Sequence, residues 1–120
     1  MAVRILVVED DPQNLYLVKF LLEKSGYEVL VATDGEAAVS VARTERLDLV
    51  LMDMLLPRMD GHDATRLIKK DPGLELPVVA LTACSMKGDR EAILQAGCDG
   101  YISKPIDPER FVSEVEAYLD

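Results

Sequence analysis

The 120 residues alternate between short apolar runs and longer amphipathic segments, and this alternation restricts the fold more than any other feature. Nearly continuous runs of branched aliphatic residues are typical of parallel strands that are covered on both faces. Each run is followed by a segment with helical spacing, so the pattern predicts five successive βα units and an α/β fold. The five expected strands are residues 3–8, 28–32, 47–52, 78–81 and 100–103.

Local signals mark the ends of the expected helices. Asp11 suits an N-cap, Pro12 suits a first turn, and Gly26 suits the C-terminal cap of the same helix. Pro108 is expected to open the last helix. The fourth helix is expected to face the core with one stripe of apolar residues, Ala92, Ile93 and Ala96. Because no linker, repeat or low-complexity segment interrupts the pattern, residues 1–120 are predicted to form one domain, an open doubly wound sheet.

Composition excludes several classes of function. A net charge of −9 argues against nucleic-acid binding, which needs a basic surface. No stretch of about 18 uncharged apolar residues is present, so no membrane-spanning helix is expected. The start of the chain lacks the pattern of an export signal. Cys84 and Cys98 are too few for a disulfide framework, so we expect reduced thiols and a cytoplasmic protein.

Polar residues with chemical potential follow four of the five apolar runs. Glu9 and Asp10 follow the first, Asp53 the third, Thr82 the fourth and Lys104 the fifth. Sites in open α/β sheets lie beyond the carboxyl ends of the strands. If the first, third, fourth and fifth strands are neighbours, these side chains converge in one shallow pocket.

The combination of groups predicts a particular chemistry. Clustered carboxylates repel one another, so at least one of them is expected to have a raised pKa, and a cation would relieve the repulsion. Oxygen ligands favour Mg²⁺ or Ca²⁺, and Mg²⁺ keeps several waters that phosphate oxygens can replace. The Asp53 carboxylate could attack phosphorus to form an aspartyl-phosphate. Lys104 and Thr82 could then hold the phosphoryl oxygens.

The spacing of these motifs resembles that of bacterial two-component response-regulator receiver domains. The resemblance covers essentially the whole chain and implies a flavodoxin-like (βα)5 sheet with strand order 2-1-3-4-5. Residues 86–90 and 101–106 look most like those of single-domain cell-division regulators, and also like receivers attached to hybrid histidine kinases. The matching motifs are VVED at 7–10, LMDMLLP at 51–57, MDG at 59–61, ALTA at 80–83, GCDGY at 97–101 and KP at 104–105.

The resemblance implies a phosphoryl-accepting switch that depends on Mg²⁺. Asp53 would be the phosphoacceptor and a metal ligand, and Asp10 would ligate the metal directly. Glu9 would act directly or through water, and the backbone carbonyl of Leu55 would be a further ligand. Many members of the family have two aspartates where this chain has Glu9 and Asp10, and the longer Glu9 could alter how the metal is reached.

The resemblance also implies roles for four further residues and a class of partner protein. Thr82 would be the switch hydroxyl, Tyr101 the switch aromatic and Lys104 the phosphoryl-binding amine, with a cis bond before Pro105. The phosphoryl donor would be a histidine kinase or a histidine phosphotransfer protein, and the output would be another protein of unknown identity. Catalysis would be limited to self-phosphorylation from phosphodonors and slow autodephosphorylation, in a monomer or weak dimer.

An output surface can be placed on the same basis. Phosphorylation is expected to act on the face formed by the fourth helix, fifth strand and fifth helix. Leu94 is a lone large apolar residue on a polar helix face, so Arg90, Leu94 and Tyr101 are the expected contacts. The alternative face is the first helix near Leu17 and Phe20.

Three other functions fit the sequence less well. A flavodoxin needs a phosphate cradle after the first strand, where this chain has acidic residues that repel phosphate. A haloacid-dehalogenase-type phosphatase needs a second aspartate two residues after the nucleophile, where this chain has Leu55. A scaffold that does not depend on phosphorylation would not need Asp53, Thr82 and Lys104 together.

Overall fold

Five parallel strands form one sheet in the order β2-β1-β3-β4-β5, as predicted. The structure is a computed structural model that describes residues 2–54, 61–71, 73, 75–83 and 87–119. Leu6 of β1 pairs with Leu30 of β2 on one side and with Val50 of β3 on the other, which places β1 inside the sheet. The strands are β1 (Arg4–Val8), β2 (Glu28–Ala32), β3 (Leu49–Asp53), β4 (Val78–Thr82) and β5 (Gly100–Ser103).

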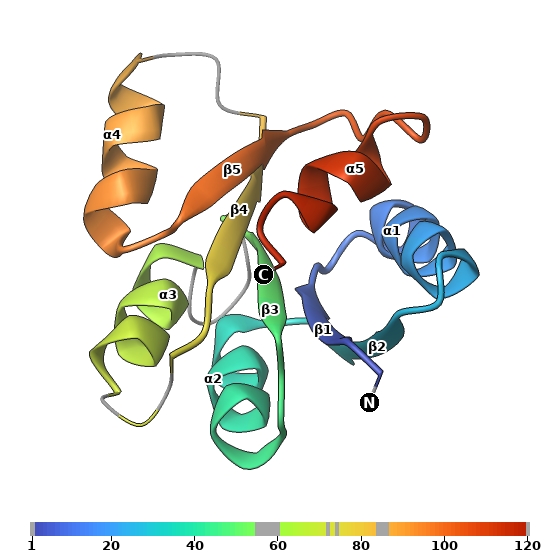
Figure 1. The fold of residues 1–120 in the computed structure, drawn as a ribbon. Coiled ribbons are helices and arrows are strands. Elements are labelled where there is room, and N and C mark those ends of the chain that lie inside the picture. Colours follow the sequence, from blue (N-terminus) through green and yellow to red (C-terminus); the bar gives the residue numbers. More distant parts are fainter. Residues whose placement is uncertain (1, 55–60, 72, 74, 84–86, 120) are drawn as a thin grey trace.

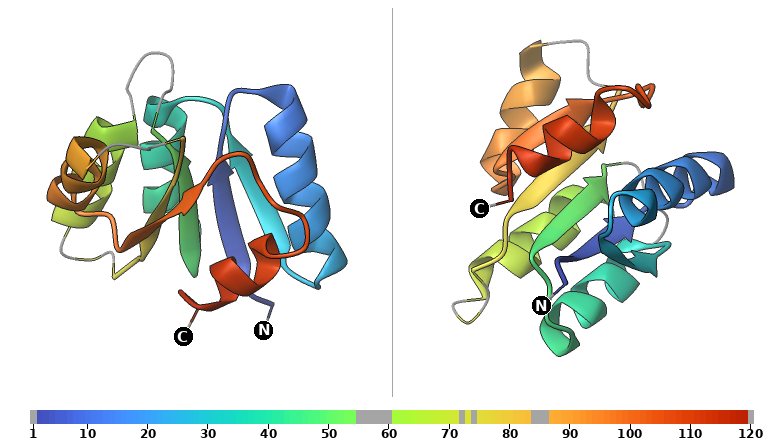
Figure 2. Two further views of the ribbon diagram at one scale, coloured as in Figure 1. Left: turned by 90° about the horizontal axis from the view of Figure 1, so that it is seen from above. Right: turned by 45° about the vertical axis from the view of Figure 1, so that its right-hand side comes forward.

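Helices cover both faces of this sheet, which makes a three-layer molecule (Figure 1). The helices α1 and α5 lie against one face, and α2, α3 and α4 lie against the other (Figure 2). Each helix connects two strands or follows the last one, as expected for right-handed βα units. The helices are α1 (Pro12–Lys24), α2 (Gly35–Thr44), α3 (Gly61–Lys70), α4 (Lys87–Ala96) and α5 (Phe111–Glu116).

The strands are apolar along their whole length because both of their faces are buried. Leu6 and Val8 pack into the cluster under α2, α3 and α4, whereas Ile5 and Val7 pack into the cluster under α1 and α5. All four side chains are fully buried. Successive residues of a strand point to opposite faces, so one five-residue strand contributes to two cores.

The start of α1 matches the predicted cap and fixes the chain directly after β1. The Asp11 carboxylate accepts a hydrogen bond from the Gln13 backbone N–H at 3.0 Å, and Pro12 is the first helical residue. At the other end Gly26 has a φ of +94°, a conformation that glycine adopts without strain. The cap therefore holds the acidic residues of the β1–α1 turn in a defined place.

Two predictions about helices need correction. Pro108 lies in a turn, and α5 begins only at Phe111, because the Asp107 carbonyl accepts the N–H groups of both Arg110 and Phe111 and closes a tight turn first. Ala92 is exposed rather than buried. Ile93 and Ala96 are buried and define the core-facing side of α4, and Ala92 falls outside this stripe.

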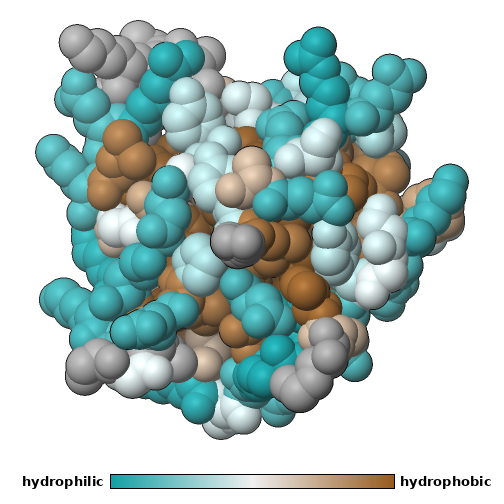
Figure 3. Space-filling model, in the orientation of Figure 1, coloured by the Kyte–Doolittle hydropathy of each residue, from teal (hydrophilic) through white to brown (hydrophobic). Residues whose placement is uncertain are grey.

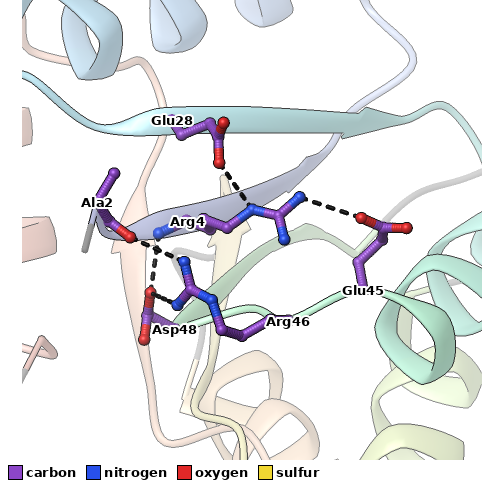
Figure 4. A network of polar contacts seen from close by, with 6 residues as sticks. All are labelled: Ala2, Arg4, Glu28, Glu45, Arg46 and Asp48. Atoms are coloured by element: carbon purple, nitrogen blue, oxygen red, sulfur yellow. Dashed lines mark hydrogen bonds and ion pairs between the residues drawn. The ribbon is translucent and has the colours of Figure 1, made fainter.

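Ion pairs close the amino-terminal end of the sheet (Figure 4). The Arg4 guanidinium pairs with Glu28 at 2.7 Å and with Glu45 at 3.0 Å, and the Arg4 backbone N–H donates to the Asp48 carboxylate at 2.8 Å. Arg46 pairs with the same Asp48 oxygen at 3.0 Å. These contacts join β1, β2 and the segment that leads into β3, so two guanidinium groups hold three carboxylates at this end.

On the face that Figure 3 shows, polar surface surrounds several apolar areas. In the view of Figure 3, hydrophobic surface lies in the centre of the face, between α5 and α1, and a smaller patch lies over α4. Among the described residues, the large apolar side chains that are most exposed include Tyr16, Phe20 and Leu94. None of the described helices is long and apolar enough to cross a membrane.

Candidate functional site

The carboxyl ends of four adjacent strands bring the predicted residues together. Glu9 and Asp10 follow β1, Asp53 is the last residue of β3, Thr82 is the last of β4, and Lys104 follows β5. The strand order places these ends side by side along one edge of the sheet. They form a pocket that is lined by Glu9, Asp10, Asp11, Asn14, Asp53, Met54, Thr82, Ala83 and Lys104.

One ammonium group lies between two buried carboxylates in this pocket. Lys104 Nζ is 2.9 Å from Glu9 Oε1 and 3.4 Å from Asp53 Oδ1. Glu9 is fully buried and Asp53 is 6% exposed. Carboxylates this far from solvent need a charged partner to remain ionised. Lys104 supplies one positive charge for both of them.

Burial and neighbouring charges shift the pKa values of Glu9 and Lys104. Burial raises the pKa of Glu9, hydrogen bonding to Asp53 raises it further, and Lys104 only partly opposes the shift. The expected raised pKa is therefore present, although burial contributes more to it than repulsion does. Burial alone would lower the pKa of Lys104, but hydrogen bonding to Glu9 and the charge of Asp53 outweigh it and raise this pKa.

Three carboxylates are arranged so that they could hold a metal ion. Ligand oxygens of Glu9, Asp10 and Asp53 lie within 4.8 Å of one another, and Asp10 is exposed at the mouth of the pocket. A donor set of carboxylate oxygens suits a hard cation such as Mg²⁺. Lys104 offsets only part of their charge, so the residues that are present fit this ion.

The backbone around the pocket fixes the carboxylates in place. Glu9 Oε2 accepts the Asp11 backbone N–H at 3.2 Å, so the same residue that caps α1 also orients Glu9. On the other side Gly61, the first residue of α3, donates its N–H to the Met54 carbonyl at 3.2 Å. A Cβ atom on Gly61 would lie 2.3 Å from the Asp53 carbonyl oxygen, so only glycine allows this approach.

Thr82 and Tyr101 lie on neighbouring strands. Thr82 pairs with Ser103, and Ala80 pairs with Tyr101, so Tyr101 lies two residues before the level of Thr82 along the strands. The Tyr101 ring is half-buried and packs against the cluster under α4. The Lys104 backbone N–H donates to the Thr82 carbonyl at 2.8 Å, and the Lys104–Pro105 peptide bond is cis.

The residues expected to contact a partner lie at the surface near this strand. Leu94 on α4 is 55% exposed. Arg90, one turn earlier, is also exposed, and its guanidinium lies 5.8 Å from the centre of the Tyr101 ring. On the alternative face, Phe20 of α1 is 49% exposed, whereas Leu17 is only half-buried and packs at the edge of the core.

Some site residues were not predicted, and one predicted residue lies outside the described part of the chain. Leu55, expected to offer its carbonyl to the metal, is outside the described residues. Asn14 was not predicted, although its place three residues after the Asp11 cap puts it on the first turn of α1, and its amide donates to Asp11 at 3.1 Å. Met54 and Ala83 also line the pocket and follow directly from their strands.

Comparison with known proteins identifies the family. The model of the response regulator receiver domain matches residues 5–116. The chain is a response-regulator receiver domain. This family consists of signalling switches of two-component systems that accept a phosphoryl group, and its members are not conventional enzymes.

Relatives of this receiver domain include both single-domain regulators and parts of kinases. The polar-differentiation response regulator DivK of Brucella anthropi is 44% identical over 120 residues, which cover 99% of this chain and 98% of that protein. The receiver domain of sensor histidine kinase PA1611 from Pseudomonas aeruginosa PAO1 is 39% identical, with a TM-score of 0.89 and 98% of each chain covered. That structure has a magnesium ion coordinated in its active-site cleft.

A third similar protein shows the same fold at lower sequence identity. A putative response regulator from Chloroflexus aurantiacus J-10-fl is 30% identical, with a TM-score of 0.93, and the match covers 99% of this receiver domain and 98% of that chain. The arrangement of strands and helices is therefore kept where most side chains differ.

Proposed function

We propose that Asp53 is the residue of this receiver domain that accepts the phosphoryl group. The observation that carries the proposal is the position of its carboxylate: nearly buried at the end of β3, 3.4 Å from Lys104 Nζ, and beside two further carboxylates. A carboxylate that is fixed in this way needs no reorganisation before it attacks phosphorus.

The donor would be a phosphohistidine of a histidine kinase or of a phosphotransfer protein. An Asp53 carboxylate oxygen forms the new bond to phosphorus, the phosphorus–nitrogen bond breaks, and the imidazole leaves with the electron pair of that bond. Bound Mg²⁺, held by Asp10 and Asp53 with Glu9 nearby, would neutralise charge that develops on the phosphoryl oxygens. The acyl phosphate then remains on β3 until water hydrolyses it.

Two further residues would act on the phosphoryl group after transfer. The Lys104 ammonium is close enough to Asp53 to pair with a phosphoryl oxygen, and the Thr82 hydroxyl lines the same pocket and could donate a hydrogen bond to another. Moving Thr82 would change the space beside Tyr101 on the neighbouring strand. The output would then be read by another protein at the face of α4, β5 and α5, with Leu94 as a contact.

A labelling experiment tests the phosphoacceptor. Acetyl phosphate with Mg²⁺ should add one phosphoryl group per chain, detected by mass spectrometry of the intact protein. Asp53→Asn should abolish the addition, because the amide keeps the shape of the side chain but loses its nucleophilic charge. Asp48→Asn is the matched control, since Asp48 lies at the opposite end of the sheet, and it should label like the wild type.

The same experiment separates the switch from a phosphatase. A receiver should be labelled once and turn over slowly, whereas a phosphatase should release phosphate repeatedly from a small phosphomonoester. Equal labelling of wild type and Asp53→Asn would show that another residue accepts the group.

A further inference from the structure

A contact between α4 and β5 links the pocket to the surface. The Arg90 guanidinium carbon lies 5.8 Å from the centre of the Tyr101 ring, within the range in which a cation is attracted to an aromatic face. Arg90 is exposed on α4, while Tyr101 is half-buried against the cluster below this helix. The ring is therefore held between the core and a surface cation.

The position of Tyr101 on the sheet connects this contact to the pocket. Tyr101 pairs with Ala80, and the next pair of residues on the same face is Thr82 with Ser103. Thr82 lines the pocket that holds Asp53. A continuous series of neighbours thus leads from the carboxylate through Thr82 and Tyr101 to Arg90.

We propose that Arg90 is a positioning residue that stabilises the resting position of the Tyr101 ring and so opposes the response of this receiver domain to phosphorylation. The inference rests on the proposed function, since it requires that a phosphoryl group on Asp53 favours a different position of the ring. A contact that is made only in the resting state adds to the free energy that phosphorylation must overcome.

The expected size follows from the exposure of the pair. A cation over an aromatic ring at an exposed site shifts an equilibrium about two- to fivefold. If Arg90 favours the resting state by this factor, its removal should tighten the binding of a phosphoryl analogue by up to the same factor, because less free energy is spent on the change of state.

Beryllofluoride is a suitable probe, because it activates a receiver domain whose fold is similar to this one. Its dissociation constant, in the presence of Mg²⁺, would be measured by titration for wild type, Arg90→Ala and Arg90→Lys. Arg90→Ala should bind about two- to fivefold more tightly than wild type. Arg90→Lys should lie between them, since lysine keeps the charge but not the flat guanidinium. Glu91→Ala, a neighbouring exposed position, is the control for a general effect of altering α4.

The same substitution in a variant without the Tyr101 ring distinguishes the ring contact from an effect of charge alone. In Tyr101→Leu, which lacks the ring, Arg90→Ala should leave the dissociation constant unchanged. In a tyrosine-labelled protein without beryllofluoride, Arg90→Ala should also shift the NMR signals of the Tyr101 ring toward those of the activated state.

The inference would be overturned if Arg90→Ala bound beryllofluoride as tightly as the wild type, or more weakly. It would also be overturned if Arg90→Ala tightened binding by the same factor in the Tyr101→Leu background. Failure of the wild type itself to bind beryllofluoride would instead contradict the proposed function.

Discussion

The two ends of the sheet both carry clusters of charged side chains, but the clusters are built differently. At the carboxyl end, Glu9 and Asp53 are buried and share the single ammonium of Lys104. At the amino end, Arg4 makes ion pairs with two carboxylates, Glu28 and Glu45, whose side chains are 56% and 44% exposed. In both clusters the carboxylates outnumber the cations, but those at the carboxyl end are shielded from water and those at the amino end are in contact with it.

This difference separates a reactive site from a structural one. Buried charges without full compensation are unfavourable in the resting protein, and a cation or a new phosphoryl group changes their energy strongly. Exposed ion pairs contribute little to the free energy of unfolding, so a change of solvent or salt alters the stability only slightly through them. The amount of uncompensated buried charge, rather than the number of charged residues, indicates which end carries the function.

The largest expected effect is the loss of the shared cation at the carboxyl end. Lys104→Met, measured by urea unfolding with chelator present, should lower the free energy of unfolding by on the order of 3 kcal/mol, because two buried carboxylates lose their partner. Lys19→Met, at an exposed position on α1, is the control and should be close to neutral. A change as small as that of the control would mean that Lys104 does not compensate the buried charge.

Addition of Mg²⁺ should act on the carboxyl end alone. The melting temperature of the wild type should rise with Mg²⁺, because an ion that binds only the native arrangement stabilises it by about 2.7 kcal/mol at 100 times the dissociation constant. Asp10→Asn should reduce the rise, and Asp48→Asn should leave it unchanged. The comparison breaks down if both variants respond to the ion alike.

The two ends should also respond to pH in opposite directions. The pKa of Glu9 is raised in the folded protein, mainly by burial, so the native state keeps its proton when the unfolded state has lost it. With chelator present, the free energy of unfolding should therefore fall as the pH rises from the ordinary glutamate pKa of about 4.3 through the raised one. Urea unfolding at several pH values should show a flatter profile for Glu9→Gln.

At the amino end the sign is reversed. The hydrogen bond from the Arg4 backbone N–H lowers the pKa of Asp48, and Arg46 adds to this shift. The contribution of Asp48 to stability is therefore present above the ordinary aspartate pKa of about 3.9 and is lost as the pH falls below it. Asp48→Asn should lose less stability on acidification than the wild type. If the free energy of unfolding of both proteins fell equally at low pH, Asp48 would not make this contribution.

The smallest effect is expected for the exposed ion pairs. Arg4→Met should lower the melting temperature less than Lys104→Met does, and the difference from wild type should shrink at high salt because exposed pairs are screened. Labelling by acetyl phosphate should stay at the wild-type level. A loss of labelling would show that the amino end contributes to the site.

The five βα units and the polar residues at the strand ends could be predicted from the sequence pattern, whereas the strand order that brings these ends together was implied by the resemblance to receiver domains. Glu9, Asp53 and Lys104 each lie at the end of a short apolar run, and the carboxyl ends of neighbouring parallel strands meet at one edge. Their roles as phosphoacceptor and metal ligands stay predictions, as does that of Leu55.

Contacts that depend on how a helix is placed over a strand were harder to foresee. Periodicity indicates that a helix has a buried side, but it does not set the rotation closely enough to exclude Ala92 from the core. The approach of Arg90 to the Tyr101 ring depends on the distance between α4 and β5, which no spacing in the sequence encodes. The hydrogen bond from the Asp11 backbone N–H to Glu9 was likewise not predicted, because almost every residue type has a backbone N–H and the sequence therefore does not single this donor out.

The close approach of Gly61 to the Asp53 carbonyl has a practical consequence for protein engineering. The hydrogen bond from Gly61 to Met54 ties together the two points where the chain leaves β3 and enters α3. Residues 55–60 could therefore be exchanged with those of another family member as a cassette, with both splice points already anchored. Such chimaeras should leave the Asp53 carboxylate in its place at the end of β3, provided that the glycine at the junction is retained.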